Sequence, residues 1–292
     1  MEVTVIDGAQ FQLQFTGRRV ATTARVSSHA ADGVSCHDCL WRWEKATSIY
    51  AERAPSWPPC EFVSLQGDRH NNQDRAETFS SGSRQLLIVA DGMGGHADGA
   101  LAAQCVMDVA ARIFADEAQQ PAAQLIQRIG LESHLAIQSV APDLSERQQP
   151  RTTVVCAVVD GPNVLFAHAG DSRAYHLRRG EIVHVTRDHS AVAMMVRRGD
   201  IHPQDARHHP MRNQVTRCLG GGGPPPALEL TPCPPVRPGD TLLLCSDGFW
   251  DPLEPDELGS NIELTELAQR AVARNPGSAD NCTALRIRFE SV

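Results

Sequence analysis

The sequence lacks any run close to the roughly 18 consecutive apolar residues that a membrane-spanning helix requires. It also lacks the basic and apolar segments of a secretory signal, since it begins with MEVTVIDGAQ. Basic residues are scarce, because 27 Lys and Arg against 35 Asp and Glu give a net charge of −8. This balance disfavours a protein that binds nucleic acid by neutralising phosphates. We therefore expect a cytoplasmic protein with neither a membrane nor a nucleic acid as partner.

Nine cysteines are present, and most lie inside apolar, strand-like runs, as Cys156 and Cys245 do. Such positions are typical of small buried side chains in a reducing compartment. A CxxC motif, Cys36–Cys39, stands apart in an irregular segment. Zinc needs four ligands at suitable spacing, and no second pair matches this one, so the motif alone does not establish a zinc site.

Residues 1–60 differ from the rest of the chain. They carry breakers such as SSHAADG and APSWPP and show no sustained period of apolar residues. We interpret them as an irregular N-terminal extension, poorly ordered or foreign to the natural start. Residues 61–292 show clear strand and helix patterns and form the expected functional domain.

Beyond residue 60, apolar periodicity and turn residues indicate the elements. Strand patterns come in hairpin runs and helix patterns come in pairs. This order favours a layered α+β fold with mostly antiparallel sheets over a doubly wound one. The expected strands are 86–90, 153–159, 164–168, 172–177, 182–185, 241–245 and 282–289, and the expected helices are 97–116, 121–139, 190–198 and 262–273.

Aspartates recur where apolar runs meet turns. A single aspartate in a turn is ordinary, because its side chain bonds nearby backbone amides. Several of them gathered at one edge of the sheets would repel one another unless cations lay between them. Hard oxygen ligands beside small glycine turns suit Mg²⁺ or Mn²⁺ rather than zinc. The aspartates are Asp74, Asp91, Asp171, Asp247, Asp251 and Asp280.

The stretch VADGMGGHADG also allows a second interpretation. Residues 92–97 match GxGxxA after a strand, the pattern of a dinucleotide-binding loop. Such a loop presents amides to pyrophosphate, and Asp91 beside it would repel phosphate unless a cation intervened. No regular βαβ alternation surrounds the motif, which favours the metal-site interpretation.

Five motifs occur in order along the chain: RHNNQD (69–74), VADGMGGH (89–96), AHAGDSRAYHLRRGEIVHVTRDHS (167–190), LLLCSDGFWD (242–251) and DNCTALRIRF (280–289). Together they resemble the PP2C (PPM) family of metal-dependent protein serine/threonine phosphatases, in its compact bacterial form. The resemblance covers about residues 61–292. It implies a four-layer α-β-β-α sandwich of two mostly antiparallel sheets flanked by helices, with a two-metal centre at one edge.

The resemblance also implies the metal ligands. Asp91 matches the carboxylate that bridges both metals, and the carbonyl of Gly92 matches a ligand of the first metal. Asp247 and Asp280 match the residues that complete the second metal site. Asp74 matches an acid that lies close, bound directly or through water. Glycine after the bridging acid leaves room for the cations and the phosphate.

Further positions match features found in some family members. Asp171, with Asp247 and Asp251, matches the acids that hold a third metal. Arg69 matches the arginine that binds the substrate phosphate, a role suited to a bidentate guanidinium. Residues 188–220 match the flap beside the active site.

One position departs from the pattern. Some family members carry a histidine directly after the metal-binding Asp-Gly, where it protonates the leaving group, whereas this chain has Met93. Methionine cannot donate a proton, so we expect water to do so, with His96 as an alternative. Gln73 also precedes Asp74 where a glutamate is frequent, which affects the hydration of the first metal.

The resemblance implies hydrolysis of phosphoserine and phosphothreonine in proteins by water activated between two Mn²⁺ or Mg²⁺ ions. The enzyme would oppose a serine/threonine kinase in bacterial signalling, and we expect a monomer. Two alternatives stay open, a binding module without catalysis and a phosphatase dedicated to one regulatory partner. Retention of Asp91, Asp247 and Asp280 disfavours the first, whereas the second shares the same chemistry.

Overall fold

The structure is a computed structural model that describes residues 2–7, 10–15, 18–19, 58–94, 98–140, 144 and 148–289. The chain divides into two compact units, Met1–Ala51 and Glu52–Val292, and each is described by itself. Among the helices that the structure describes, none is long and apolar enough to cross a membrane.

Among its described residues, the first unit has three short strands. They are β1 (Glu2–Asp7), β2 (Gln10–Phe15) and β3 (Arg18–Arg19), and they form an antiparallel sheet in the order β1-β2-β3. Residues 20–57, including Cys36–Cys39, lie outside the described residues. The irregular extension and the question of a zinc site therefore stay predictions.

Two antiparallel sheets form the centre of the second unit. The larger has the order β12-β7-β6-β8-β9-β13, with β5 also paired to β6, and the smaller has the order β11-β10-β14-β15-β4. The larger sheet consists of β5 (Asp74–Ser81), β6 (Arg84–Met93), β7 (Arg151–Thr152), β8 (Val154–Asp160), β9 (Asn163–Ala169), β12 (Leu219–Gly220) and β13 (Glu229–Cys233). The smaller sheet consists of β4 (Cys60–Leu65), β10 (Arg173–Arg178), β11 (Glu181–Val185), β14 (Asp240–Cys245) and β15 (Cys282–Arg288).

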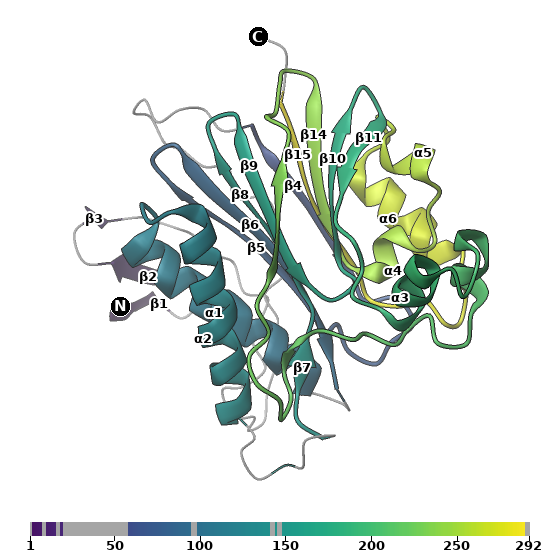
Figure 1. The fold of residues 1–292 in the computed structure, drawn as a ribbon. Coiled ribbons are helices and arrows are strands. Elements are labelled where there is room, and N and C mark those ends of the chain that lie inside the picture. The colour runs from purple at the N-terminus through teal and green to yellow at the C-terminus, as the bar shows by residue number, and fades with distance from the viewer. Residues whose placement is uncertain are drawn as a thin grey trace. The chain divides into compact units, whose positions relative to one another are not determined.

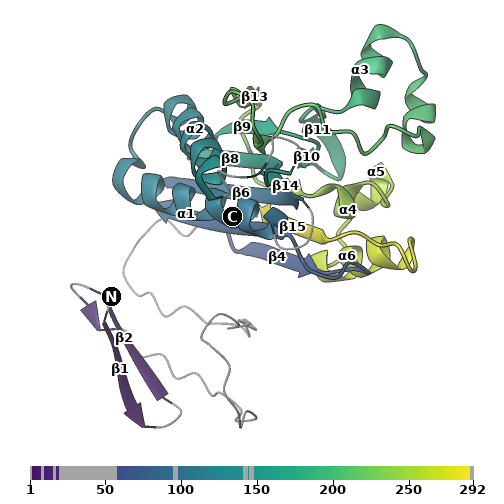
Figure 2. The same cartoon turned by 90° about the horizontal axis from the view of Figure 1, so that it is seen from below.

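Helices cover the outer face of each sheet, as Figures 1 and 2 show. The helix pair α1 and α2 packs on the larger sheet, and α4, α5 and α6 pack on the smaller one. The helices are α1 (Asp98–Glu117), α2 (Ala122–Val140), α3 (Ala191–Arg198), α4 (Asp247–Trp250), α5 (Pro255–Leu258) and α6 (Leu264–Ala273), with a 3-10 helix η1 at Pro203–His208.

Three apolar clusters hold these layers together. One lies between the α1–α2 pair and the larger sheet, one between the sheets, and one between the smaller sheet and its helices. The central strands are covered on both faces, so residues 86–90 of β6 form a continuous buried apolar run rather than an alternating one. The predicted four-layer α-β-β-α sandwich with antiparallel sheets is confirmed.

Candidate metal centre

Four aspartates from distant parts of the chain line one cleft of about 610 Å³. Asp91 comes from β6 and Asp171 from the turn between β9 and β10. Asp247 begins α4, and Asp280 lies just before β15. Arg69 is part of the same lining. The fold therefore brings the predicted metal and phosphate residues together at one edge of the two sheets.

Asp74 lies directly opposite Asp91 across the β5–β6 pairing. Its side chain is 2% exposed, and Ser246 Oγ donates a hydrogen bond of 2.7 Å to its Oδ2. Its Oδ1, like the Oδ1 of Asp247, is buried without a hydrogen-bond partner. Buried carboxylate oxygens without a donor are costly, and a divalent cation is a partner that suits them. This donor set fits the metal that the family resemblance implies.

Four carboxyl groups at this edge, those of Asp74, Asp91, Asp171 and Asp247, have pKa values above the ordinary value. Burial raises the pKa of Asp91 well above its usual value, and the charges of Asp74 and Asp247 raise it further. Burial is also the main cause that raises the pKa of Asp171 to about 8, of Asp74 to about 7 and of Asp247 to about 6. Bound cations would replace these protons as the compensating positive charge.

Backbone hydrogen bonds fix the position of Asp91. The carbonyl oxygen of Asp91 accepts from Thr153 N and from Thr152 Oγ1, both at 2.9 Å. Its own N–H donates to Thr153 Oγ1 at 3.1 Å. Asp91 lies within β6 rather than at its end, because the strand continues beyond it where Gly92 pairs with Thr152 of β7. The carboxylate is thus attached to a strand that is paired on both sides.

Glycine at position 92 is required by the approach of two backbones. A β-carbon there would overlap the carbonyl oxygen of Gly99 in the first turn of α1. At position 248 a β-carbon would likewise overlap the carbonyl oxygen of Asn281. We expect glycine at these positions because it leaves room for cations and phosphate, and the close packing of the backbone is a second reason.

Arg69 lies at the cleft with its guanidinium paired to a predicted metal ligand. Its Nη2 is 2.7 Å from Asp280 Oδ2, and the two side chains are 57% and 39% exposed. An exposed pair of this kind is weak and exchangeable. Arg69 is therefore free to turn toward an anionic substrate once another positive charge binds Asp280.

Asp171 and Asp251 meet at an adjoining cavity of about 220 Å³, which they line with Asp247 and with Arg207 and Arg212 of the predicted flap. These are the three acids of the predicted third metal site. The turn that carries Asp171 is also anchored, because Trp250 Nε1 donates to the Asp171 carbonyl oxygen at 2.9 Å.

An ion pair anchors the start of the predicted flap (188–220) next to the turn that carries Asp171. Arg173 makes a bidentate ion pair with Asp188, at 2.8 Å for both contacts, where the predicted flap begins. The same guanidinium stacks on the Trp250 ring, 3.3 Å from its centroid.

Comparison with known sequences identifies the family. The profile of the family described as Protein phosphatase 2C matches residues 64–280, most of the chain. The chain belongs to the protein phosphatase 2C family.

Two curated relatives of this phosphatase 2C chain are bacterial. The serine/threonine protein phosphatase PstP of Mycobacterium tuberculosis is 34% identical over 228 residues, which cover 74% of this chain and 42% of PstP. The chain therefore spans less than half the length of that relative. The serine/threonine phosphatase stp of Listeria innocua is 34% identical over 235 residues, which cover 75% of this chain and 90% of stp.

Solved structures share the fold. The S. agalactiae serine/threonine phosphatase has a TM-score of 0.72 at 27% identity, covering 80% of this chain and 100% of its own. The catalytic domain of PstP, solved in complex with two manganese ions, has a TM-score of 0.65 at 30% identity, covering 80% of this chain and 99% of its own.

Asn281 supports the candidate metal centre of this phosphatase 2C chain, a role that the sequence analysis did not identify. Its Oδ1 accepts from Gln73 N at 2.8 Å, and its Nδ2 donates to the carbonyl oxygens of Gln66 and Asn71 at 2.7 and 3.0 Å. Because Asn281 directly follows Asp280, these hydrogen bonds hold the loop of the first motif close to Asp280. The sequence signal that could have indicated this role is the position of Asn281 directly after the predicted ligand Asp280.

Two positions, 93 and 96, bear on the proton donor, which we expect to be water, with His96 as the alternative. Met93 lines the cleft, in the position where some family members carry histidine. His96 lies outside the described residues, so its role stays a prediction.

Proposed function

We propose that this chain hydrolyses phosphoserine and phosphothreonine in proteins with the help of two divalent cations, Mn²⁺ or Mg²⁺, and a possible third. The observation that carries the proposal is a group of four aspartates with raised pKa values, two of which, Asp74 and Asp247, have a buried oxygen without a hydrogen-bond partner. Three of the four, Asp91, Asp171 and Asp247, line a cleft with Arg69 in a member of the phosphatase 2C family.

In this proposal the ligands are those that the family motif assigns. Asp91 would bridge two cations, the Gly92 carbonyl would bind the first, and Asp247 and Asp280 would bind the second, with Asp74 close by. Asp171 and Asp251, together with Asp247, would hold a third. Cations bound there would supply an activated water as nucleophile and would neutralise charge on the phosphoryl group.

The remaining steps fall to the side chains of the chain. Arg69 would leave Asp280 and donate a bidentate pair of hydrogen bonds to the phosphoryl oxygens. Asp91, whose backbone is held by the hydrogen bonds described above, would help to keep the attacking water and the phosphoryl group in line. Because Met93 has no proton to give, the leaving serine or threonine oxygen would take its proton from water in the cleft.

The test is hydrolysis of a phosphothreonine peptide by the full chain, with and without Mn²⁺. We expect activity that needs Mn²⁺ and falls to the metal-free background in Asp91→Asn. Asp116→Asn, an exposed aspartate of α1, is the matched control and should behave as wild type. A folded wild-type protein without activity on phosphoserine and phosphothreonine peptides would favour a binding module that kept its carboxylates.

We further propose that the chain acts as a monomer and opposes a serine/threonine kinase. The relatives named phosphatases of serine and threonine support the substrate class. Assays of candidate phosphoproteins would identify the substrate and would show whether one regulatory partner dominates.

A further inference from the structure

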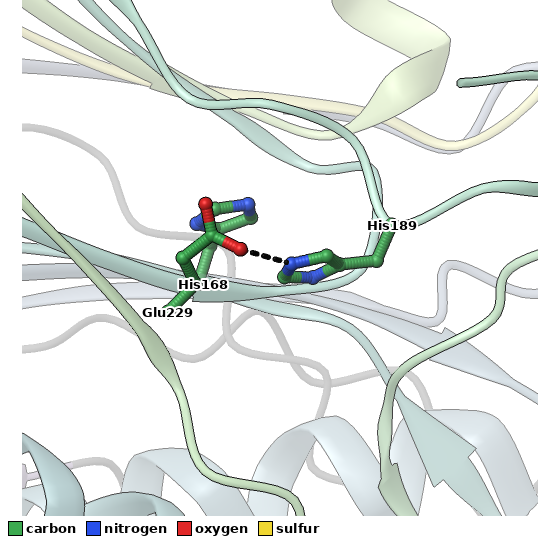
Figure 3. A group of neighbouring side chains, drawn as sticks. All are labelled: His168, His189 and Glu229. Atoms are coloured by element: carbon green, nitrogen blue, oxygen red, sulfur yellow. Dashed lines mark hydrogen bonds and ion pairs between the residues drawn. The ribbon is translucent and has the colours of Figure 1, made fainter. Parts of the chain in front are cut away.

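A second cluster of titratable side chains, drawn in Figure 3, is not part of the cleft lining. His168 from β9, His189 from the start of the flap and Glu229 from β13 bring three possible ligand atoms within 4.8 Å of one another. The two histidines are buried and Glu229 is half-exposed. A metal site is the first hypothesis to test against the geometry.

The geometry of the rings does not suit a shared metal. The His168 and His189 rings are stacked, with centroids 4.4 Å apart and planes at 3° (Figure 3). An imidazole lone pair lies in the plane of its ring, so two parallel stacked rings cannot direct lone pairs at one ion. His189 Nδ1 also accepts a hydrogen bond from Gly170 N at 3.2 Å. Nε2 therefore carries the ring proton and donates it to Glu229 Oε2 at 2.9 Å.

His189 instead holds the turn that precedes Asp171. Its Nδ1 accepts from Gly170 N, and its own backbone N–H donates to Gly170 O at 2.9 Å. Gly170 has φ +122°, and a β-carbon there would overlap Thr153, so this turn requires glycine and packs closely against Thr153. Asp171, the next residue, is 6% exposed and faces the cleft.

His189 also holds the base of the flap. Its carbonyl oxygen accepts from Thr216 N at 2.7 Å, and beside this pair Ala191 N donates to Gln214 O at 2.8 Å. The segment between these bonds carries Arg212, which lines the cavity of Asp171 and Asp251. One residue therefore contacts both the turn and the two ends of the flap.

Glu229 fixes the tautomer on which this arrangement depends. Burial lowers the pKa of His189, which favours the neutral ring, and the hydrogen bond from Gly170 N shows that Nδ1 is an acceptor. The carboxylate on Nε2 keeps the proton there and leaves Nδ1 for Gly170. Arg217 Nη1 lies 3.8 Å from Glu229 Oε2, which favours the ionised carboxylate.

We propose that His189, oriented by Glu229, is a positioning residue that ties the Gly170–Asp171 turn to the base of the flap. In this arrangement Asp171 is presented to the cation that it would share with Asp247 and Asp251. The inference rests on the proposed function, because it requires that these acids bind a divalent cation.

The test is calorimetric titration of the metal-free full chain with MnCl₂. His189→Ala should weaken the weakest Mn²⁺ site about 10- to 100-fold, the usual effect of losing a residue that orients a ligand, and should leave the tighter sites unchanged. Asp171→Asn should affect the same site. His189→Asn, whose side-chain oxygen can accept from Gly170 N, should recover much of the affinity, and Glu229→Leu should lose more than Glu229→Gln.

His176 provides the matched control. It is a buried histidine of β10 whose Nε2 lies 2.8 Å from Asp240 Oδ2, and it lines neither the cleft nor the adjoining cavity. His176→Ala should lower the melting temperature as His189→Ala does, yet leave every Mn²⁺ affinity unchanged.

Three results would overturn the inference. A folded His189→Ala protein with wild-type Mn²⁺ binding would show that the residue is structural only. Should His189→Ala fail to fold, a Glu229→Leu protein with wild-type binding would have the same meaning. A wild-type chain that binds no Mn²⁺ would overturn the inference together with the proposed function, whereas unchanged variants of a binding wild type would overturn the inference alone.

Discussion

At the residue scale, the cleft concentrates carboxyl groups that the folded chain cannot ionise together without cost. Their pKa values lie above the ordinary value of 3.8, at about 7 for Asp74, about 8 for Asp171 and about 6 for Asp247. Without metal, these carboxyls therefore bind more protons in the folded protein than in the unfolded chain over this pH range. Their contribution to stability must then fall as pH rises, because their ionisation is more favourable in the unfolded state.

In protein treated with a chelator, these carboxyls should lower the free energy of unfolding between about pH 4 and pH 8, by about 1.4 kcal/mol per pH unit for each extra proton that the folded state holds. Denaturant unfolding of wild type and Asp91→Asn at a series of pH values isolates this contribution, because the histidines with lowered pKa values act in the opposite direction in both proteins. Saturating Mg²⁺ or Mn²⁺ should make the wild-type slope less negative above neutral pH, and Asp91→Asn should do so without metal. Equal slopes for wild type and Asp91→Asn without metal would contradict the assignment.

Arg69 supports a second prediction at this scale. Replacing it with alanine removes a charged hydrogen-bond donor to the phosphate, so kcat/KM should fall about 10- to 100-fold. Arg69→Lys should lie in between, because lysine keeps the charge but not the bidentate geometry. Arg112→Ala, at an exposed ion pair with Glu132 on the helix pair, is the control and should keep full activity. Equal rates for wild type and Arg69→Ala would show that Arg69 does not bind the substrate phosphate.

The residues that the sequence could predict are those with a local signal. Asp91 and Asp247 follow apolar runs and precede glycine, so the pattern alone singles them out. Asn281 and His189 act on backbone groups far along the chain, at Gln73 and Gly170. No local pattern reports such partners, so these two supporting roles needed the fold.

At the element scale, the contact between β6 and α1 depends on Gly92. A β-carbon there would overlap the Gly99 carbonyl oxygen, so Gly92→Ala must displace the start of α1 or the end of β6. We expect a loss of roughly 1–3 kcal/mol in unfolding free energy and a weaker metal site. Gly223→Ala is the control, since a β-carbon there meets nothing within 4 Å. Equal unfolding curves for both variants would refute this packing.

Elements with strong local patterns were predicted, and elements with mixed patterns were not. β8 is a continuous apolar run buried on both faces, and α1 has apolar residues at helical spacing. β13 lies at the edge of its sheet and contains Pro232, which normally argues against a strand. β5 is polar along most of its length, so neither strand carries the apolar signal that indicated the others.

At the scale of the whole molecule, hairpin runs and helix pairs predicted layers but not strand order. The smaller sheet joins β4 with β15, elements from opposite ends of the phosphatase 2C region. Hairpin chemistry says nothing about such pairings, and the family resemblance implied two facing sheets without the order of their strands. The β5–β6 pairing places Asp74 opposite Asp91, and the charge of Asp280, just before β15, also acts on Asp74, so strands from distant parts of the chain bring these carboxylates to one edge.

The division of the chain into units gives a prediction at this scale. The family match begins at residue 64, and the second unit begins at Glu52. A protein that starts at Glu52 should therefore melt at the temperature of the full chain's main transition and hydrolyse the phosphothreonine peptide at the same rate. Loss of folding or activity in this truncated protein would show that the N-terminal segment contributes to the enzyme.

The central claim is that the aspartates of one cleft hold divalent cations. Anomalous diffraction at the manganese edge, from crystals of the full chain grown with MnCl₂, tests it most directly. We expect at least two peaks, with Asp91 coordinating both and with Asp247 and Asp280 at the second. Peaks elsewhere, for example beside His168 and Glu229, or no peak in the cleft, would contradict the account.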